Sequence, residues 1–480
     1  MLLPYSCAAR LRSGRLLLAL LLAPAAPALA QTGFAPGTPY PCGSNLPAKV
    51  VLGDVNGDGL ADIVAGNQSG AAISVLLNQP AAAGTFGTPL RCPTGGGQPR
   101  GIALGDVNGD GRPDIVTANA AGGNVSVLLS LAPQSATFAP PTSYGSGGTQ
   151  PTTVALGDVN GDGRPDIVTG DFVTGRVGVL LNQAGLPGTF GAVATFDGGV
   201  SRLTGVALGD VNGDGRPDIV TGSFGGGGIG VLLSTAPQAA QFSAPTTYVA
   251  SGPADVVLHD VNGDGRLDIL AADSYTDAVL VLLNQASLPG AFGAATSYSS
   301  GGRYPGYLAV RDVSGDGRAD IVVGNEGAAP DPGSVGVLLG LPGQPGTFGA
   351  VVTYSSGDLG PFSIALGDVN GDGRPDAVTS NYRSTTVSVL LNSFPTAAAT
   401  AAATVVDIYP NPAQAQFTVR LPAGFGPAQA ELLNSLGQVV RQQALPAQVA
   451  VPTTGLPAGV YTLRLRPATG PALTRRVVLH

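Results

Sequence analysis

The 480-residue chain has no tryptophan, one methionine and two histidines, and only 11% of its residues are charged. No cluster of lysine and arginine marks a nucleic-acid-binding surface, and positive charge is too sparse to attract the chain to an anionic membrane. Beyond residue 30, no apolar run reaches the length that a transmembrane helix needs. We therefore expect neither a nucleic-acid partner nor a transmembrane segment.

The first thirty residues have the pattern of a secretory signal peptide. Arg10, Arg12 and Arg15 precede the apolar run LLLALLLAPAAPALA, and Ala28 and Ala30 supply the small residues of an A-x-A cleavage site. The run is too short to span a membrane. Residues 1–30 are predicted to be a signal peptide, and the mature protein is predicted to be secreted, either extracellular or on the outer cell surface.

An acidic motif, LGDVNGDGRPDIVTG at residues 156–170, occurs in seven similar copies. Its first aspartate falls at 54, 106, 158, 210, 260, 312 and 368, so the repeat is 50–56 residues long. Each unit opens with a phenylalanine and contains four strand-sized runs of four to seven residues, bounded by glycine and other turn residues. No run has helical spacing.

This repeat predicts an all-β fold: a seven-bladed β-propeller of four-stranded antiparallel blades over residues 31–392. A stacked solenoid is the alternative, but it needs capping units, and the first and seventh units are as regular as the others. Successive turns of an up-and-down blade alternate between two faces. The acidic loops should therefore share one face, and the variable loops that follow DIVTG should share the other.

The acidic loop carries oxygen-bearing side chains at positions 1, 3, 5 and 9, with glycine at position 6. This spacing directs the side chains toward one point, and the carbonyl of position 7 can add another oxygen. Such a set suits calcium, and the loop has no His or Cys for zinc or copper. The predicted metal ligands are Asp54, Asn56, Asp58, Leu60, Asp62, Asp106, Asn108, Asp110, Arg112, Asp114, Asp158, Asn160, Asp162, Arg164, Asp166, Asp210, Asn212, Asp214, Arg216, Asp218, Asp260, Asn262, Asp264, Arg266, Asp268, Asp312, Ser314, Asp316, Arg318, Asp320, Asp368, Asn370, Asp372, Arg374 and Asp376.

The sequence argues against two other interpretations of the loop. An EF-hand needs a glutamate at position 12, where this chain has Ala, Thr or Val. Asx-rich turns without metal would leave three carboxylates repelling each other. Residues 31–403 contain 14 basic and 29 acidic residues, a net charge of −15, and seven calcium ions would bring it to about −1. We expect about seven structural calcium sites, with the weakest at Ser314, where a hydroxyl replaces the amide of position 3.

The phenylalanine-glycine opening and the DVNGDGRPD loop between strands resemble the FG-GAP (VCBS) repeats of integrin α-subunit propellers and of many bacterial secreted proteins. The resemblance covers residues 34–392. It implies that the loops bind calcium for structure through positions 1, 3, 5 and 9, and that ligands meet the opposite face.

Residues 393–404, SFPTAAATAAAT, are predicted to be an Ala/Thr/Pro linker. The alternation in QFTVRL and VYTLRLR then predicts a small β-sandwich over 405–480. YPNPA, NSLGQVV, LPAGVYTLRL and the basic ending RRVVLH together resemble a type IX secretion C-terminal sorting domain, which implies the type IX secretion machinery as a partner. A generic carbohydrate-binding or Ig-like module is the alternative.

Cys42 and Cys92 remain after the signal peptide, in GTPYPC and GTPLRC. Disulfides are usual in exported proteins, but equivalent positions of neighbouring units are expected to lie too far apart to bridge. The sequence therefore weighs slightly against a Cys42–Cys92 bond.

No catalytic constellation is evident, so an enzyme is the less favoured class. Outside the acidic loops the propeller has eight acids and one histidine, His259, which stands next to the fifth loop. A calcium-dependent polysaccharide lyase or hydrolase is the alternative function, and it would need its carboxylates from Asp171, Asp197, Asp255, Asp273, Asp277, Glu326, Asp331 and Asp358.

The favoured function is a non-catalytic adhesion or binding module for an extracellular protein or glycan. Exposed Tyr and Arg are typical of such contacts, and the variable face is predicted to carry several. The candidate ligand-binding residues are Arg303, Tyr304, Tyr307, Tyr275 and Tyr382, with Arg100, Arg202, Glu326, Asp331, Phe362 and Arg383 around them.

Overall fold

The computed structural model describes residues 33–43, 46–132, 135–225, 227–236 and 240–394, and then 407–409, 413, 416–420, 428–434, 438–445, 448–467 and 473–479. The predicted signal peptide lies outside these residues, as does the linker after residue 394. Every regular element in the described part is a β-strand, so the all-β prediction is confirmed. The described residues include no helix that could cross a lipid bilayer.

Seven antiparallel four-stranded sheets lie between Thr38 and Leu390, and we number them as blades 1–7. Each is given from its innermost to its outermost strand. Blades 1–4 are β2 (Pro47–Gly53), β3 (Asp62–Asn67), β4 (Ala72–Leu76) and β5 (Leu90–Pro93); β6 (Pro99–Gly105), β7 (Asp114–Asn119), β8 (Asn124–Leu128) and β11 (Thr142–Gly145); β12 (Pro151–Gly157), β13 (Asp166–Asp171), β14 (Arg176–Leu180) and β15 (Ala194–Asp197); and β16 (Leu203–Gly209), β17 (Asp218–Ser223), β18 (Ile229–Leu232) and β21 (Thr246–Tyr248).

Blades 5–7 follow the same plan, except that the last blade takes its outer strand from the N-terminal end of the propeller. They are β22 (Pro253–His259), β23 (Asp268–Asp273), β24 (Ala278–Leu282) and β25 (Thr296–Ser299); β26 (Pro305–Arg311), β27 (Asp320–Asn325), β28 (Ser334–Leu338) and β29 (Val352–Tyr354); and β30 (Pro361–Gly367), β31 (Asp376–Asn381), β32 (Thr386–Leu390) and β1 (Thr38–Pro41). Short hairpins, β9 (Ser130–Ala132) with β10 (Ser135–Phe138) and β19 (Ser234–Ala236) with β20 (Gln241–Phe242), extend two of the loops.

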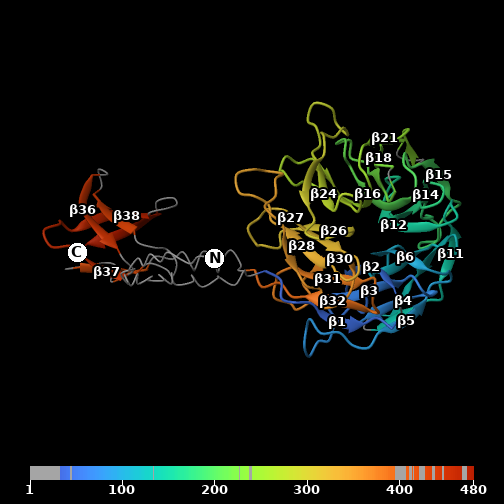
Figure 1. The fold of residues 1–480 in the computed structure, drawn as a ribbon, viewed down its shortest axis with the longest axis horizontal. Helices are drawn as coiled ribbons and strands as arrows, with labels where there is room; N and C mark the ends of the chain where they lie inside the picture. Colours follow the sequence, from blue (N-terminus) through green and yellow to red (C-terminus); the bar gives the residue numbers. More distant parts are fainter. Residues whose placement is uncertain are drawn as a thin grey trace, which may run out of the picture. The chain divides into compact units, whose positions relative to one another are not determined.

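The blades form a ring, visible in Figure 1. Each innermost strand contacts the innermost strand of the next blade, and β30 contacts β2, which closes the circle. The β-propeller fold is therefore confirmed. β1 pairs with β32 from Thr38↔Val389 to Pro41↔Thr386, so the sequence repeat and the blade are offset by one strand. A ring closed in this way has no free end, and this explains why the terminal units need no caps.

Alternating Val, Ile and Leu of adjacent blades fill the spaces between the sheets. The phenylalanines that open the units mostly pack edge-to-face against an aromatic ring of the preceding blade's outer strand. These pairs are Phe34–Tyr354, Phe86–Tyr40, Phe190–Tyr144, Phe242–Phe196, Phe292–Tyr248 and Phe348–Tyr298, with centroids 5.2–5.8 Å apart. Such pairs add about 0.5–1.5 kcal/mol each to the energy of burial.

Cys42 and Cys92 form no disulfide in the described structure. Cys42 Sγ donates to the carbonyl of Thr385 at 3.0 Å. The expected equivalence of the two cysteines is wrong: Cys92 pairs with Ile73 as Tyr40 pairs with Val387, so Cys92 occupies the tyrosine position. Tyr40 and Cys92 both lie six residues after the phenylalanine of their unit, whereas GTPYPC begins two positions later in its unit than GTPLRC does, so matching these letters misaligns the two units.

The C-terminal segment forms two antiparallel sheets. One contains β33 (Asp407–Tyr409), β34 (Gln416–Arg420) and β37 (Gln448–Pro452), and the other β36 (Val439–Leu445), β35 (Ala428–Leu433), β38 (Gly459–Pro467) and β39 (Leu473–Leu479). Phe417, Val419 and Val451 of the first sheet share one core with Leu432 and Leu463 of the second. This is the predicted small β-sandwich.

Candidate functional site

Each acidic loop connects the innermost strand of a blade to the second strand. The aspartate of position 9 begins the second strand and is fully buried in all seven blades. Its Oδ2 accepts the backbone N–H of position 2 at 2.9–3.1 Å, and its Oδ1 accepts a backbone N–H just after the third strand at 2.7–2.9 Å. This carboxylate therefore ties three parts of each blade together.

Burial raises the pKa of these position-9 carboxylates. The pKa rises to about 6 for Asp62, Asp114, Asp166, Asp218, Asp268 and Asp376, because desolvation and the aspartates of positions 5 and 1 outweigh the two backbone hydrogen bonds. Desolvation also raises the pKa of Asp320. A nearby cation would stabilise the charged form of such groups.

The aspartate of position 1 holds the turn itself. Asp158 Oδ1 accepts the N–H of Gly161 at 2.7 Å and of Asp162 at 3.0 Å, and Oδ2 accepts that of Gly163 at 2.7 Å. The same three bonds occur in the other loops. Gly161 and Gly163 have φ of 77° and 83°, so both loop glycines, and not position 6 alone, adopt the left-handed conformation that glycine permits.

The side chain at position 7 has a role that the sequence interpretation missed. In six loops an arginine there pairs with the aspartate of position 5, for example Arg216 Nη2 with Asp214 Oδ2 at 2.6 Å. The first loop has Leu60 instead. The loops therefore carry part of their neutralising charge within themselves, a signal that the repeated GDGR could have given.

The donor set of each loop fits calcium, because it consists of carboxylate and amide oxygens. Among the described residues, however, no three His, Cys, Asp or Glu side chains lie close enough together to share a metal ion. The loop oxygens instead accept backbone N–H groups. A carboxylate has about four acceptor sites. Six of the position-9 carboxylates use two of them and Asp320 uses three, so acceptor capacity remains. The sixth loop lacks the amide bonds of position 3, and Ser314 Oγ contacts Asp312 Oδ1 at 3.4 Å.

The opposite ends of the strands surround a central cavity of about 240 Å³. The second residue of several innermost strands and the first residue after several second strands line it. The lining residues are Ala48, Gln68, Arg100, Thr152, Phe172, Thr204, Phe224, Ala254, Tyr307, Glu326, Phe362 and Tyr382. Five of the residues predicted on the variable face thus meet here: Arg100, Tyr307, Glu326, Phe362 and Tyr382.

Tyr307 is buried at the centre of the ring, with 8% of its surface exposed. Its ring packs edge-to-face on Phe362, and Lys49 Nζ lies 4.0 Å from its centroid. Lys49 is the only lysine of the chain. Asp255 is also buried and accepts the N–H of Leu308 at 3.3 Å. Desolvation lowers the pKa of Lys49 and raises that of Asp255, and their mutual attraction opposes both shifts.

The other candidate ligand-binding residues lie outside the cavity lining. Tyr304 is 41% exposed, beside the guanidinium of Arg303, whose Cζ is 5.4 Å from the ring centroid. Tyr275 is 53% exposed and packs on Phe224 at 5.6 Å. Because Phe224 lines the cavity, Tyr275 extends its aromatic surface outward.

Arg383, Glu326 and Asp331 link two neighbouring loops. Arg383 Nη2 donates to the carbonyls of Glu326 and Asp331 at 2.7 and 2.6 Å, and its Nε lies 4.0 Å from Glu326 Oε1. Arg383 thus positions loops more than it presents charge to solvent.

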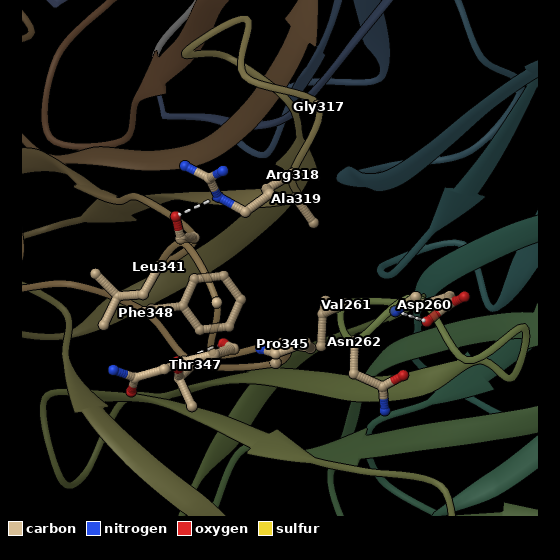
Figure 2. A pocket seen from close by; sticks show the side chains of 15 residues that line it. Asp260, Val261, Asn262, Gly317, Arg318, Ala319, Leu341, Pro345, Thr347 and Phe348 are labelled. Carbon is tan, nitrogen blue, oxygen red and sulfur yellow. Dashed lines mark hydrogen bonds between the residues drawn. The ribbon is translucent and has the colours of Figure 1, made fainter. Parts of the chain in front are cut away.

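A second cavity, of about 200 Å³, lies on the acidic-loop face between blades 5 and 6. Figure 2 shows its walls, with Asp260–Asn262 on one side and Arg318 donating to the Gly340 carbonyl on the other. Four other blades have asparagine where Gly340 stands, and each amide donates to a carbonyl of the preceding blade at 2.7–2.8 Å: Asn78, Asn182, Asn284 and Asn392. Between blades 5 and 6, Gly340 has no such amide, and the backbone N–H of Gly346 donates to the Val261 carbonyl instead, at 3.1 Å.

Sequence reasoning missed Lys49, Gln68, Thr152, Phe172 and Thr204. For Lys49, Thr152 and Thr204 the signal was the second and third residues of the innermost strands, which read PAKV, PRGI, PTTV, LTGV, PADV, PGYL and PFSI. These two positions vary from unit to unit, whereas the apolar residues on either side of them are similar in all units.

Family models agree with this architecture. An FG-GAP-like repeat matches residues 54–117, 106–169, 260–323 and 312–379, and an FG-GAP repeat matches 203–233. A secretion system C-terminal sorting domain matches 407–480. The chain belongs to the FG-GAP repeat proteins and carries a type IX sorting domain, which marks proteins exported to the cell surface or the extracellular space.

Solved structures share the fold. The chain is similar to BBS1N in complex with ARL6DN, soaked with mercury (TM-score 0.51, 11% identity) or with lead (TM-score 0.50, 12% identity), in both cases over 75% of this chain and 97% of that chain. It is also similar to the extracellular domain of the hybrid two component system BT3049 from B. thetaiotaomicron, with TM-score 0.45 and 12% identity, over 93% of this chain and 58% of that one. No curated protein matches the chain.

Proposed function

We propose that this exported propeller is a non-catalytic binding module for an extracellular glycan or protein, and that calcium stabilises it. The observation that supports binding is the separation of the two faces. The acidic loops repeat the same residues on one face, whereas each blade brings different side chains to the cavity on the other. A concave site with aromatic walls and a few polar groups is the usual form of a ligand site.

Calcium would be held by the oxygens of positions 1, 3, 5 and 9 and the carbonyl of position 7. The ion would supply positive charge to three aspartates that lie within nine residues of each other. The loops already have the turn that such a site needs, because the position-1 aspartate and the two glycines fix it.

The proposal is tested by incubating the mature protein on glycan and extracellular-protein arrays, with calcium and with a chelator. We expect a restricted set of ligands, retained only while the propeller is folded. An array on which the folded protein binds nothing would contradict the binding function.

A calcium-dependent polysaccharide lyase or hydrolase is the second candidate. Lys49, Asp255 and Tyr307 at the ring centre are the observation that favours it, since buried titratable groups next to a cavity are common at catalytic sites. Incubation with acidic and neutral polysaccharides, followed by measurement of new reducing ends, separates the two functions. Release of oligosaccharides that stops in Lys49→Met would favour the enzyme.

A further inference from the structure

The central cavity contains one cation without a carboxylate partner. Among the described residues, no carboxylate lies within ion-pair distance of Arg100, whereas the other charged residue of the lining, Glu326, pairs with Arg383. In the amide orientation that satisfies both neighbours, Gln68 accepts from Arg100 Nε at 2.9 Å and donates to Tyr382 Oη at 2.7 Å. Gln68 therefore holds the guanidinium in place without neutralising it, and such a fixed arginine suits a carboxylate.

The walls suit a ring-shaped ligand. Phe172, Phe224, Phe362 and Tyr382 come from three different blades and supply aromatic surface. The volume of about 240 Å³ equals about eight water molecules at their liquid volume. One sugar unit fits this space, whereas an oligosaccharide would have to leave through the mouth.

Hydroxyl groups complete the lining. Thr204 Oγ1 is buried and has no hydrogen-bond partner among the described residues. Thr152, one blade earlier, is different because its Oγ1 donates to the carbonyl of Leu203 at 2.6 Å. A buried hydroxyl that lacks a partner destabilises the fold, so Thr204 is explained best by a ligand that supplies the partner.

The rim retains side chains at strained positions. Leu46, Gln98, Arg202 and Tyr304 each precede an innermost strand and have φ of 54–58°, where blade 7 has Gly360 with φ of 73°. Non-glycine residues in this conformation destabilise a fold and gather at ligand sites. These side chains therefore have a use that glycine would not serve.

We infer that the central cavity binds a single carboxylate-bearing sugar unit at the end of a glycan, with Arg100 contacting the carboxylate and Thr204 a ring hydroxyl. This inference rests on the proposed binding function and specifies its ligand class.

The test is saturation-transfer NMR and calorimetry on the mature protein in calcium, with glucuronate and galacturonate as probes. Glucose, galactose and an N-acetyl amino acid are the comparison compounds. We expect one of the acidic sugars to bind with a Kd on the order of 1 mM, as ligand efficiency allows for so small a molecule. Neutral sugars and the amino acid should bind at least tenfold more weakly.

Two variants and one control make the test specific. Arg100→Gln should weaken binding at least tenfold, and Thr204→Val, which keeps the side-chain shape, should weaken it severalfold without lowering the melting temperature. Arg91→Gln on the outer strand β5 should bind like the parent.

Each other result overturns a stated part. If a neutral sugar binds as tightly as the acidic sugars, Arg100 does not contact a ligand carboxylate. If the N-acetyl amino acid binds as tightly, the ligand need not be a sugar. Array ligands that bind the variants as tightly as the parent overturn the cavity site but leave the proposed function standing. Absence of any array ligand overturns both.

Discussion

The two faces of the propeller are built from the same strands but are held together differently. On the acidic-loop face, side-chain carboxylates of positions 1 and 9 accept the backbone N–H groups, so those residues cannot change without losing the turn. On the cavity face, the residue after each second strand donates its N–H to the carbonyl of the residue before the innermost strand, at 2.7–3.1 Å. Those bonds involve backbone only, so the side chains are free to differ between blades.

This difference teaches where variation is permitted in a repeated fold. The seven acidic loops are nearly identical because their side chains make the structural hydrogen bonds. The residues at the cavity differ between blades because only the backbone makes such bonds there. Specificity for a ligand can therefore be built on the second face without disturbing the first.

Removal of calcium should have the largest effect and should act through the acidic-loop face. At 2 mM free calcium and a Kd of about 10⁻⁴ M, each site contributes about 1.8 kcal/mol, so chelation should lower the melting temperature by at least about 10 °C. Differential scanning calorimetry before chelation, after it and after calcium is restored measures the effect. An unchanged melting temperature would refute the structural metal.

Asp166→Asn should have the next largest effect. It places an amide N–H₂ against one of two backbone N–H donors in a fully buried site, and we expect a loss of about 2–4 kcal/mol. Urea unfolding in excess calcium measures it. Asp197→Asn, at the end of the outer strand β15, is the matched control and should change stability by less than about 0.5 kcal/mol. Equal losses in both would erase the contrast between buried and exposed aspartates.

Lys49→Met tests the ring centre, between the two faces. It leaves Asp255 buried without its attracting cation, and we expect a loss of about 1–3 kcal/mol at pH 7. The pKa of Asp255 is raised in the folded protein, so its ionisation is a penalty that disappears as the pH falls and the carboxylate is protonated. The difference between variant and parent in urea unfolding should therefore shrink from pH 7 to pH 4. Tyr307, which faces the same site, stays neutral over that range because burial raises the pKa of its phenol. A constant difference would show that Asp255 is not responsible.

Tyr304→Gly should have the smallest effect and the opposite sign. Relief of the left-handed conformation at φ of 54° should raise stability by about 1 kcal/mol. Tyr275→Gly, an exposed tyrosine of the same face without a positive φ, should instead lower stability slightly. The measurement is the melting temperature of each variant relative to the parent. A lower melting temperature in both variants would show that Tyr304 is not in a strained conformation.

The repeat was predictable because it is local: turn glycines, the acidic loop and the Val/Leu/Ile runs each fall within one unit. What could not be predicted depends on contacts between strands of one blade or between units. Asp166 looks like one ligand among five, although its two partners lie 7 and 16 residues away. Lys49 looks like an ordinary strand residue, and only ring closure brings it over Tyr307, which lies 258 positions later in the chain.

The two cysteines are a different case, because the sequence did contain the answer. Cys92 and Tyr40 both lie six residues after the phenylalanine of their unit, and the pairing of Cys92 with β4 confirms that it replaces a tyrosine. The candidate tyrosines show the limit again. Tyr304 and Tyr307 are three residues apart, yet one lies at the rim and the other at the centre, since the strand begins between them.

Blade 7 is completed by β1, so all four of its strands lie between Thr38 and Leu390. A protease that cut the chain between residues 395 and 406 would sever no hydrogen-bonded strand from its neighbours in the ring. Detachment of the sorting domain would therefore leave every blade of the propeller with its full set of strands.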